Sequence, residues 1–264
     1  MKKKSIVAAI SALSLIVSMN IGIGSVFASE QNTVPGTAEQ PFVVTDGLFD
    51  QTKTESDLGL SKIEGAETVT VFTATDDTDH YCNGVVMTEF KGKLYTQWQS
   101  SAKDEDAEDT WVAYSVSDDN GATWSEPKVL VPTIDNGYCS SGGWFVSGDT
   151  LVSYINVWYS DTTPRGGFAY YVESTDGEHW SEMKPVLMKD GTPMEGIIEQ
   201  DPHVLASGRI VNAAHFQPGL FAYPIYTDDP SGTKGWVKAQ YTCMEQGEGA
   251  TTSREMEPSL FVNE

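Results

Sequence analysis

SDDNGATW, at Ser117–Trp124, is the segment from which the rest of the chain is best interpreted. A second copy, STDGEHW, occupies Ser174–Trp180, and a weaker third copy ends at Trp236. The three tryptophans are spaced 56 residues apart. A strand–glycine–strand pattern recurs with a similar period, around Gly92, Gly148 and Gly208. Two independent markers that share one period indicate a repeated structural unit.

Each unit is predicted to hold four short antiparallel strands. Runs rich in Val, Tyr, Phe, Thr and Trp alternate with clusters of Gly, Asp, Asn and Ser, and no long helical period interrupts them. A hairpin followed by a strand pair with an Asp–Gly turn is typical of a propeller blade. The chain is therefore predicted to be all-β, with strands in the runs 68–74, 85–90, 94–99, 111–116, 151–157 and 168–172.

Composition limits the partners. The chain has 264 residues and a formal net charge of −22, and 39% of its residues are hydrophobic. This supports a buried core, whereas the acidity excludes nucleic acid and anionic membrane surfaces as partners. The start of the chain reads as a signal peptide, with three lysines, an apolar stretch and small residues that predict cleavage near Ala28. We therefore expect a secreted, extracellular protein with no membrane contact after cleavage.

The domain organisation follows from these signals. Residues 1–28 form the signal peptide, 29–66 a polar linker or loosely docked segment, and 67–264 the repeated region. Three cysteines, an odd number, allow at most one disulfide and show no zinc-ligand spacing. Core positions are the simplest interpretation of Cys82, Cys139 and Cys243.

The motif at Ser117–Trp124 fits S-x-D-x-G-x-T-W and resembles the Asp-box, or BNR repeat, of sialidases and related propellers. The Asp carboxylate accepts backbone N–H bonds in its own turn, Gly takes a positive φ, and Trp packs between sheets. We therefore assign structural roles, not catalytic ones, to Ser117, Asp119, Gly121, Trp124, Ser174, Asp176, Gly177 and Trp180.

The resemblance implies a sialidase-like propeller of six blades, or seven as in some relatives. Residues 67–264 hold about three and a half repeat units, so we expect about four blades in an incomplete propeller. An unclosed ring exposes strand edges, so we expect the chain to be an N-terminal fragment with poor stability. The full-length protein is expected to be a monomer.

The resemblance also implies an activity, that of an exo-acting, sialidase-like glycoside hydrolase on acidic terminal sugars of glycans. Such enzymes are expected to hold the sugar carboxylate with three arginines, and to use a Tyr–Glu nucleophile and an Asp acid/base. This chain has three arginines in all, and Tyr81–Gly84 stand where the first would lie. The specificity for sialic acid is therefore left open.

Candidate site residues follow from the positions that match the family. The acidic loop 103–109 offers Asp106 or Asp109 as the acid/base. Glu255 or Glu257, in the segment that begins a later blade with Glu257-Pro258, is the candidate to assist a nucleophile. The candidate substrate-binding arginines are Arg209 and Arg254.

Two further functions remain open. A rhamnose–glucuronate-directed lyase or hydrolase on plant or microbial polysaccharide would use His80 as a base, with His203 and His215 binding substrate. A non-catalytic glycan-binding propeller would need only aromatic rings that stack on sugar faces, and the candidates at hairpin ends and loops are Trp98, Trp111, Trp144, Trp158, Tyr138 and Tyr159. A glycan is the expected partner in all three, with no cofactor and no transition-metal site, and with calcium in the acidic loops left undecided.

Overall fold

The computed structural model describes residues 52–54, 65–75, 78–163, 166–240 and 257–260. The chain divides into two units, residues 1–66 and 67–264, and every described strand lies in the second. The predicted signal peptide and most of the predicted linker lie outside the described residues. Among the residues described, no helix is long and apolar enough to cross a membrane.

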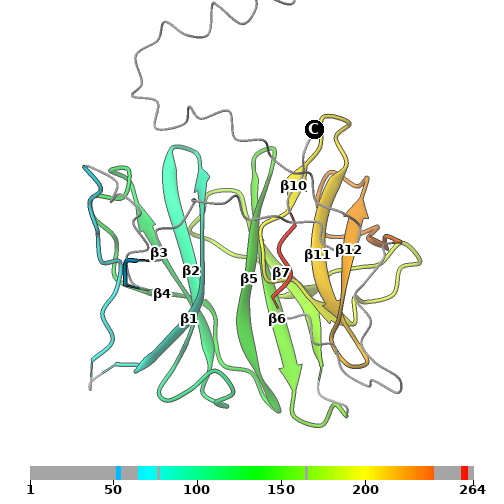
Figure 1. The fold of residues 1–264 in the computed structure, drawn as a ribbon, viewed down its shortest axis with the longest axis horizontal. Helices are drawn as coiled ribbons and strands as arrows, with labels where there is room; N and C mark the ends of the chain where they lie inside the picture. Colours follow the sequence, from blue (N-terminus) through cyan, green and yellow to red (C-terminus); the bar gives the residue numbers. More distant parts are fainter. Residues whose placement is uncertain (1–51, 55–64, 76–77, 164–165, 241–256, 261–264) are drawn as a thin grey trace, which may run out of the picture. The chain divides into compact units, whose positions relative to one another are not determined.

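The second unit contains three separate antiparallel sheets, which stand next to one another along the chain (Figure 1). The first sheet is formed by β1 (Tyr81–Phe90), β2 (Lys93–Ser101), β3 (Trp111–Ser117) and β4 (Lys128–Val131). The second is formed by β5 (Gly137–Ser147), β6 (Thr150–Tyr159), β7 (Gly167–Ser174) and β8 (Lys184–Pro185). The third is formed by β9 (Gly196–Ile197), β10 (His203–Val204), β11 (Ile210–Phe216), β12 (Phe221–Thr227) and β13 (Val237–Lys238).

These sheets are propeller blades, and the all-β prediction is confirmed. The first two sheets have four strands in sequence order. In the third, the first strand is split into β9 and β10, which both pair with β11. Three blades are thus described, and most residues of the expected fourth lie outside the described ranges. The strand predicted at 68–74 is wrong, because this segment pairs with no strand and instead stacks Phe72 on Trp98, with ring centroids 6.0 Å apart.

The first hairpin shows why the chain turns where it does. Phe90 pairs with Lys93, so the loop between β1 and β2 has two residues, Lys91 and Gly92. Both have positive φ, 51° and 77°. Two consecutive positive φ values define the tight turn that matches the twist of paired strands.

Aromatic side chains fill the space between neighbouring sheets. Trp144 of β5 lies 5.9 Å from the ring of Trp180, which in turn meets Tyr114 of β3 at 5.6 Å. The second Asp-box tryptophan therefore packs between the first and second blades. Trp236, the tryptophan of the third repeat, is fully buried among side chains of the second and third blades.

The Asp-box turns are held by their own side chains. Asp119 accepts hydrogen bonds from the backbone N and Oγ1 of Thr123 and from Ser117 Oγ, at 2.6–2.8 Å. These bonds lower the pKa of Asp119 to about 2. Asp176 makes the corresponding bonds to the backbone of Glu178 and His179, and its pKa is also well below the ordinary range. The turns therefore use their carboxylates for local structure.

Buried amides tie each blade to the next. Gln97 of β2 donates to the carbonyls of Gly142 and Gly143, each at 3.3 Å. Asn156 of β6 donates to Ile198 O and accepts from Ile198 N, both at 2.9 Å. These bonds run from the second strand of one blade to the bulge of β5 and to the segment between β9 and β10, and so they fix how neighbouring blades are oriented.

Candidate functional site

A pocket of about 400 Å³ lies where the three blades converge, and all three contribute to it. Gln99, Asn156 and His215 line it from the second strand of each blade. They occupy equivalent positions in the three blades, because they pair with Val112, Ala169 and Ala222. Each of these partners lies five residues before the first residue of its repeat, which is Ser117, Ser174 or Thr227. Equivalent residues of successive blades face one cavity only near the propeller axis, so we call it the axial pocket.

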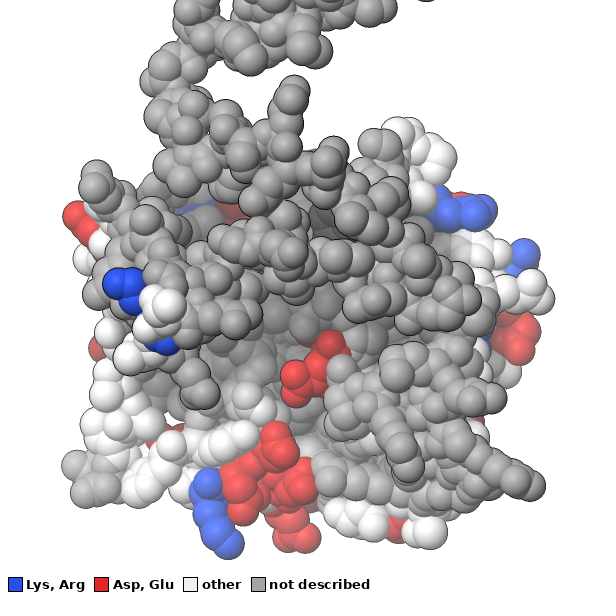
Figure 2. All heavy atoms as spheres, viewed as in Figure 1, with Lys and Arg blue, Asp and Glu red and all other residues white. Residues whose placement is uncertain are grey.

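Four carboxylates line the axial pocket, namely Glu105, Asp106, Glu199 and Glu257. Asp106 accepts a hydrogen bond from the hydroxyl of Tyr138 at 2.8 Å. Figure 2 shows acidic side chains gathered in the lower centre of the view. The pocket is therefore rich in groups that accept hydrogen bonds and carry negative charge.

Glu199 is the carboxylate with the most unusual environment. It lies between β9 and β10, and its side chain is 28% exposed. Burial, with a smaller contribution from the charge of Glu257, raises its pKa to about 7. Its Oε2 lies 3.5 Å from Nδ1 of His215, whose side chain is 1% exposed. A carboxyl group with a pKa of about 7 is about half protonated at neutral pH and can donate a proton.

An aromatic pair forms another part of the wall. The rings of Tyr138 and Trp158 stack with an interplanar angle of 13° and centroids 6.1 Å apart. The indole N–H of Trp158 donates to Ser140 Oγ at 3.2 Å, which fixes the ring on β5 and β6. Flat, partly exposed rings beside polar groups are suited to packing against the faces of sugars.

The structure brings three of the candidate residues together in the axial pocket, Asp106, His215 and Glu257. Asp109 lies outside the lining and accepts a hydrogen bond from the backbone N of Ala102 at 3.2 Å. His80 and His203 are exposed and also lie outside it.

The predicted arginines are not part of the described pocket. Arg209 precedes β11, at the opposite end of that strand from His215. Its guanidinium binds both carboxylate oxygens of Asp228 at 2.8 and 2.9 Å and lies 4.3 Å above the ring of Tyr226. Arg254 lies outside the described residues. Arg209 therefore holds the open end of the β11–β12 hairpin, opposite its connecting turn, and does not reach a ligand in the axial pocket.

Glu199 is the residue that the sequence reasoning missed. Its segment, Glu199-Gln-Asp-Pro, parallels Glu255-Met-Glu-Pro 56 residues later. In both segments a Glu stands two residues before an acidic residue that is followed by Pro, and this repeat could have pointed to Glu199 from the sequence. The carboxylate of Asp201 in the same segment accepts from the backbone N of Trp144 at 2.6 Å and so serves blade packing.

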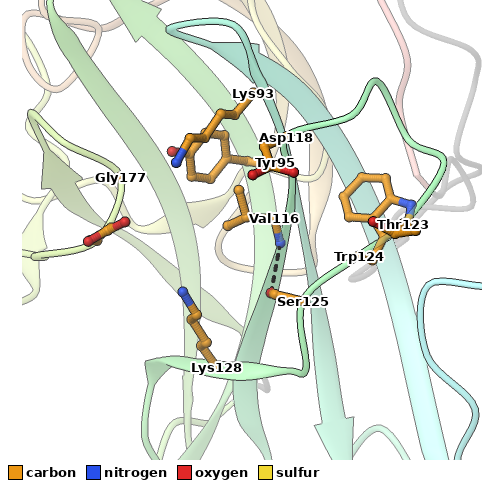
Figure 3. Close-up of a pocket in the computed structure, with 10 residues that line it drawn as sticks. Lys93, Tyr95, Val116, Asp118, Thr123, Trp124, Ser125, Lys128 and Gly177 are labelled. Atoms are coloured by element: carbon orange, nitrogen blue, oxygen red, sulfur yellow. Dashed lines mark hydrogen bonds between the residues drawn. The ribbon is translucent and has the colours of Figure 1, made fainter.

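A second pocket, of about 310 Å³, lies on the Asp-box side between the first two blades (Figure 3). Lys93 and Lys128 point toward it, and Val116 and Tyr95 lie behind it (Figure 3). The backbone N of Val116 donates to Ser125 Oγ at 3.1 Å. Its other lining residues come largely from the two Asp-box turns, so we assign this pocket to the junction of the blades.

Few of the described residues could bind a metal ion or react as a thiol. Within the described ranges, no group of three His, Cys, Asp or Glu side chains is placed to hold a metal ion. Cys139 is buried, as predicted, whereas the core position predicted for Cys82 is wrong, because this residue is exposed on β1, where most side chains are exposed. Both are free thiols, and Cys243 lies outside the described residues.

Comparisons with known proteins agree with this fold. The sequence profile of the BNR repeat-like domain matches residues 92–264. A crystal structure of a protein of unknown function from Dyadobacter fermentans superimposes with a TM-score of 0.51 at 13% identity, covering 64% of this chain and 56% of that one. The intramolecular trans-sialidase of Ruminococcus gnavus, in complex with oseltamivir carboxylate, gives a TM-score of 0.51 at 12% identity, covering 69% and 65%.

At these identities the likeness shows the fold alone. The chain spans between 56% and 65% of the length of these two structures. No curated protein sequence matches the chain.

Proposed function

Because the chain belongs to the BNR repeat-like domain family, we propose that the axial pocket is the active site of a sialidase-like glycoside hydrolase. The observation that carries the proposal is the presence of Asp106 and the raised-pKa carboxyl of Glu199 in one pocket beside a stacked aromatic pair. Most glycoside hydrolases use two carboxyl groups, one as acid and one as base, and the proposal follows this scheme in place of the Tyr–Glu nucleophile that the family resemblance implies. A pocket of about 400 Å³ suits one terminal sugar better than a polymer, so the action is exo.

The two carboxyl groups have distinct roles. Glu199 gives its proton to the glycosidic oxygen as the bond from that oxygen to the anomeric carbon breaks. Water adds to the anomeric carbon and releases a proton to the Asp106 carboxylate, so charge and atoms balance. The ring of Trp158, held by Ser140 and Tyr138, packs against the sugar.

The proposal is tested with a panel of fluorogenic glycosides that includes a sialoside and several neutral and amino sugars. We expect release from at least one substrate, and a loss in kcat of about 10²–10⁴-fold for Glu199→Gln and for Asp106→Asn. Glu108→Gln, an exposed residue of the same acidic loop that is outside the pocket lining, is the matched control and should retain full activity. Turnover that survives both pocket substitutions would contradict the proposal.

Two further assays of the same protein distinguish the other candidate functions. Appearance of unsaturated uronate from gum arabic would favour a lyase that uses His215 as its base, since this is the histidine that lines the pocket. Glycan binding without turnover would favour a non-catalytic propeller.

We also propose that the protein works outside the cell. The support is the signal-peptide pattern in residues 1–28. When the full sequence is expressed, the protein should be found in the exported fraction with a mature N-terminus near Ser29 by mass spectrometry. Retention of the protein inside the cell with Met1 intact would contradict this.

A further inference from the structure

We infer that His215 is a positioning residue for Glu199: its imidazole Nδ1–H faces Oε2 of the carboxyl group, so that the transferable proton is held on Oε1. The inference rests on the proposed function only for the statement that Glu199 protonates the glycosidic oxygen. The arrangement of the two side chains belongs to the folded chain itself, so it can be measured without a substrate.

The backbone places the two residues close together. His215 lies on β11, which has neighbouring strands on both sides, and it pairs with Ile197 of β9. Glu199 follows Ile197 by two residues. The residue between them, Ile198, is bound at both its N–H and its carbonyl by the side chain of Asn156, at 2.9 Å each. The segment that carries Glu199 is therefore attached to the third blade on one side and to the second blade on the other.

The two side chains meet at one buried pair of atoms. Nδ1 of His215 lies 3.5 Å from Oε2 of Glu199, and the imidazole is 1% exposed. Oε2 is buried and accepts no hydrogen bond from any described residue. A buried acceptor without a donor is costly, and catalytic hydrogen bonds that are long without a ligand commonly shorten when substrate binds. The imidazole N–H is therefore the group placed to satisfy Oε2.

The tautomer of His215 then decides where Glu199 carries its proton. In a neutral imidazole one ring nitrogen donates and the other accepts. If Nδ1 carries the hydrogen, Oε2 accepts from it and the proton of Glu199 belongs on Oε1. If Nδ1 is bare, the carboxyl group donates to it through Oε2 and the proton points into the protein. Oε2 is buried whereas the side chain as a whole is partly exposed, so only the first arrangement presents the proton to the cavity.

The lining around this pair is otherwise acidic. Among the described lining residues of the axial pocket, His215 is the only histidine, lysine or arginine. The other titratable groups around Glu199 are Glu105, Asp106, Tyr138 and Glu257 in the lining, and Asp201 in the same segment. Burial and the charge of Glu257 favour the protonated form of Glu199 and raise its pKa to about 7. An N–H donated to Oε2 favours the ionised form instead, so its removal should let Glu199 keep its proton to higher pH.

The first experiment determines the tautomer in the parent protein. The full chain is labelled with ¹⁵N-histidine, and the ring nitrogens are observed by NMR at about pH 6, where Glu199 is mostly protonated. The chain has four histidines and the other three are exposed, so the ring N–H that exchanges slowly with water identifies His215. We expect the hydrogen on Nδ1, and a hydrogen on Nε2 alone would overturn the inference. The measurement needs no substitution, so it decides the tautomer even if variants at this buried position fail to fold.

The second experiment separates the two ring positions by substitution. His215→Asn puts an amide N–H near the place of Nδ1, whereas His215→Gln puts it near the place of Nε2. The titration of Glu199 is followed by the infrared band of its protonated carboxyl group, which is assigned by its absence in Glu199→Gln. We expect the midpoint to rise by about one pH unit in His215→Gln and by less than about 0.3 in His215→Asn.

The matched control is His203→Gln, which changes an exposed histidine of β10 outside the lining and should leave the Glu199 midpoint where it is. An unchanged midpoint in His215→Gln would overturn the inference, and so would equal midpoints in His215→Asn and His215→Gln.

The third experiment uses whichever glycoside the panel shows to be cleaved. His215→Gln should lower kcat about 10–100-fold with KM changed by less than about twofold, and the upper limb of the pH profile of kcat should move upward together with the infrared midpoint. His215→Asn should lower kcat only about threefold. Equal losses in the two variants with an unmoved upper limb would show that His215 only fills space in the core, contrary to the inference.

The inference and the proposed function can fail separately. If the Nδ1–H tautomer and the infrared midpoints are as expected but no glycoside is hydrolysed, the proposed function fails and the arrangement of His215 and Glu199 stands. If a glycoside is hydrolysed in a way that depends on Glu199 but the hydrogen is on Nε2 alone, the proposed function stands and the inference fails.

Discussion

Replacing Glu199 with Gln should change how stability depends on pH. The folded protein holds the Glu199 proton up to a pKa of about 7, whereas the ordinary value for the unfolded chain is 4.5. Between these values the unfolded state binds fewer protons than the folded state. The free energy of unfolding therefore falls as pH rises from about 4.5 to 7, and this contribution is constant above that range.

The size of the effect follows from the difference between the two pKa values. A rise from 4.5 to about 7 corresponds to about 3 kcal/mol, at about 1.4 kcal/mol for each pKa unit. The side chain is 28% exposed, so water stabilises part of its charge and we expect about 2–3 kcal/mol. Glu199→Gln carries no titratable proton and should lose this slope, becoming more stable than the parent at neutral pH.

The measurement is urea denaturation followed by tryptophan fluorescence, for parent and variant, at several pH values from about 4.5 to 8. Only the difference between the two proteins is interpreted, because other carboxylates titrate in both. Glu89→Gln, an exposed change on β1 outside the axial pocket, is the control. A parent–variant difference that stays flat with pH, or that grows in favour of the parent, would refute the reasoning.

Four further substitutions test the fold. Gly177→Ala should cost about 2–4 kcal/mol of unfolding free energy, because φ is +74° and the new Cβ would clash with Tyr95 Oη. Gly148→Ala, with φ +56° and no atom within 4 Å of the new Cβ, should cost about 1 kcal/mol. Equal losses in urea denaturation would contradict this. Asn156→Ala removes both bonds to Ile198 and should cost about 2–4 kcal/mol by the same measurement, whereas a neutral result would show that the amide does not join the blades. Asp119→Asn should lower Tm most near neutral pH and least near pH 2. The bonds from Thr123 and Ser117 hold the pKa of Asp119 at about 2, so their contribution to stability is lost as pH falls. A constant drop in Tm across pH would be the contrary result.

The repeat was readable because its chemistry is local. Asp119, Gly121 and Trp124 lie within one turn, so their spacing alone specifies the hydrogen bonds that form. The degraded third copy could also be identified, since Trp236 Nε1 donates to Gly232 O at 2.8 Å much as Trp124 Nε1 donates to Gly121 O at 3.2 Å.

The site was less predictable because it is assembled from distant segments. Glu199 owes its raised pKa to burial between strands that are far apart in sequence, and no local pattern encodes that burial. Arg209 illustrates the opposite failure. Its residue type suggested a ligand for an anion, but its strand places it away from the pocket and beside Asp228, 19 residues further along the chain. Charge at a position can be read from sequence, whereas the partner that neutralises it is set by the ladder register.

The amides that join the blades can form their hydrogen bonds only after synthesis has reached the next blade. Gln97 finds its partners 45 and 46 residues later, and Asn156 finds its partner 42 residues later. A ribosome adds about 5–20 residues per second, so each of these amides waits several seconds for its partner after it emerges. The first and second blades therefore each hold a buried amide that stays unpaired until the blade after it has been made.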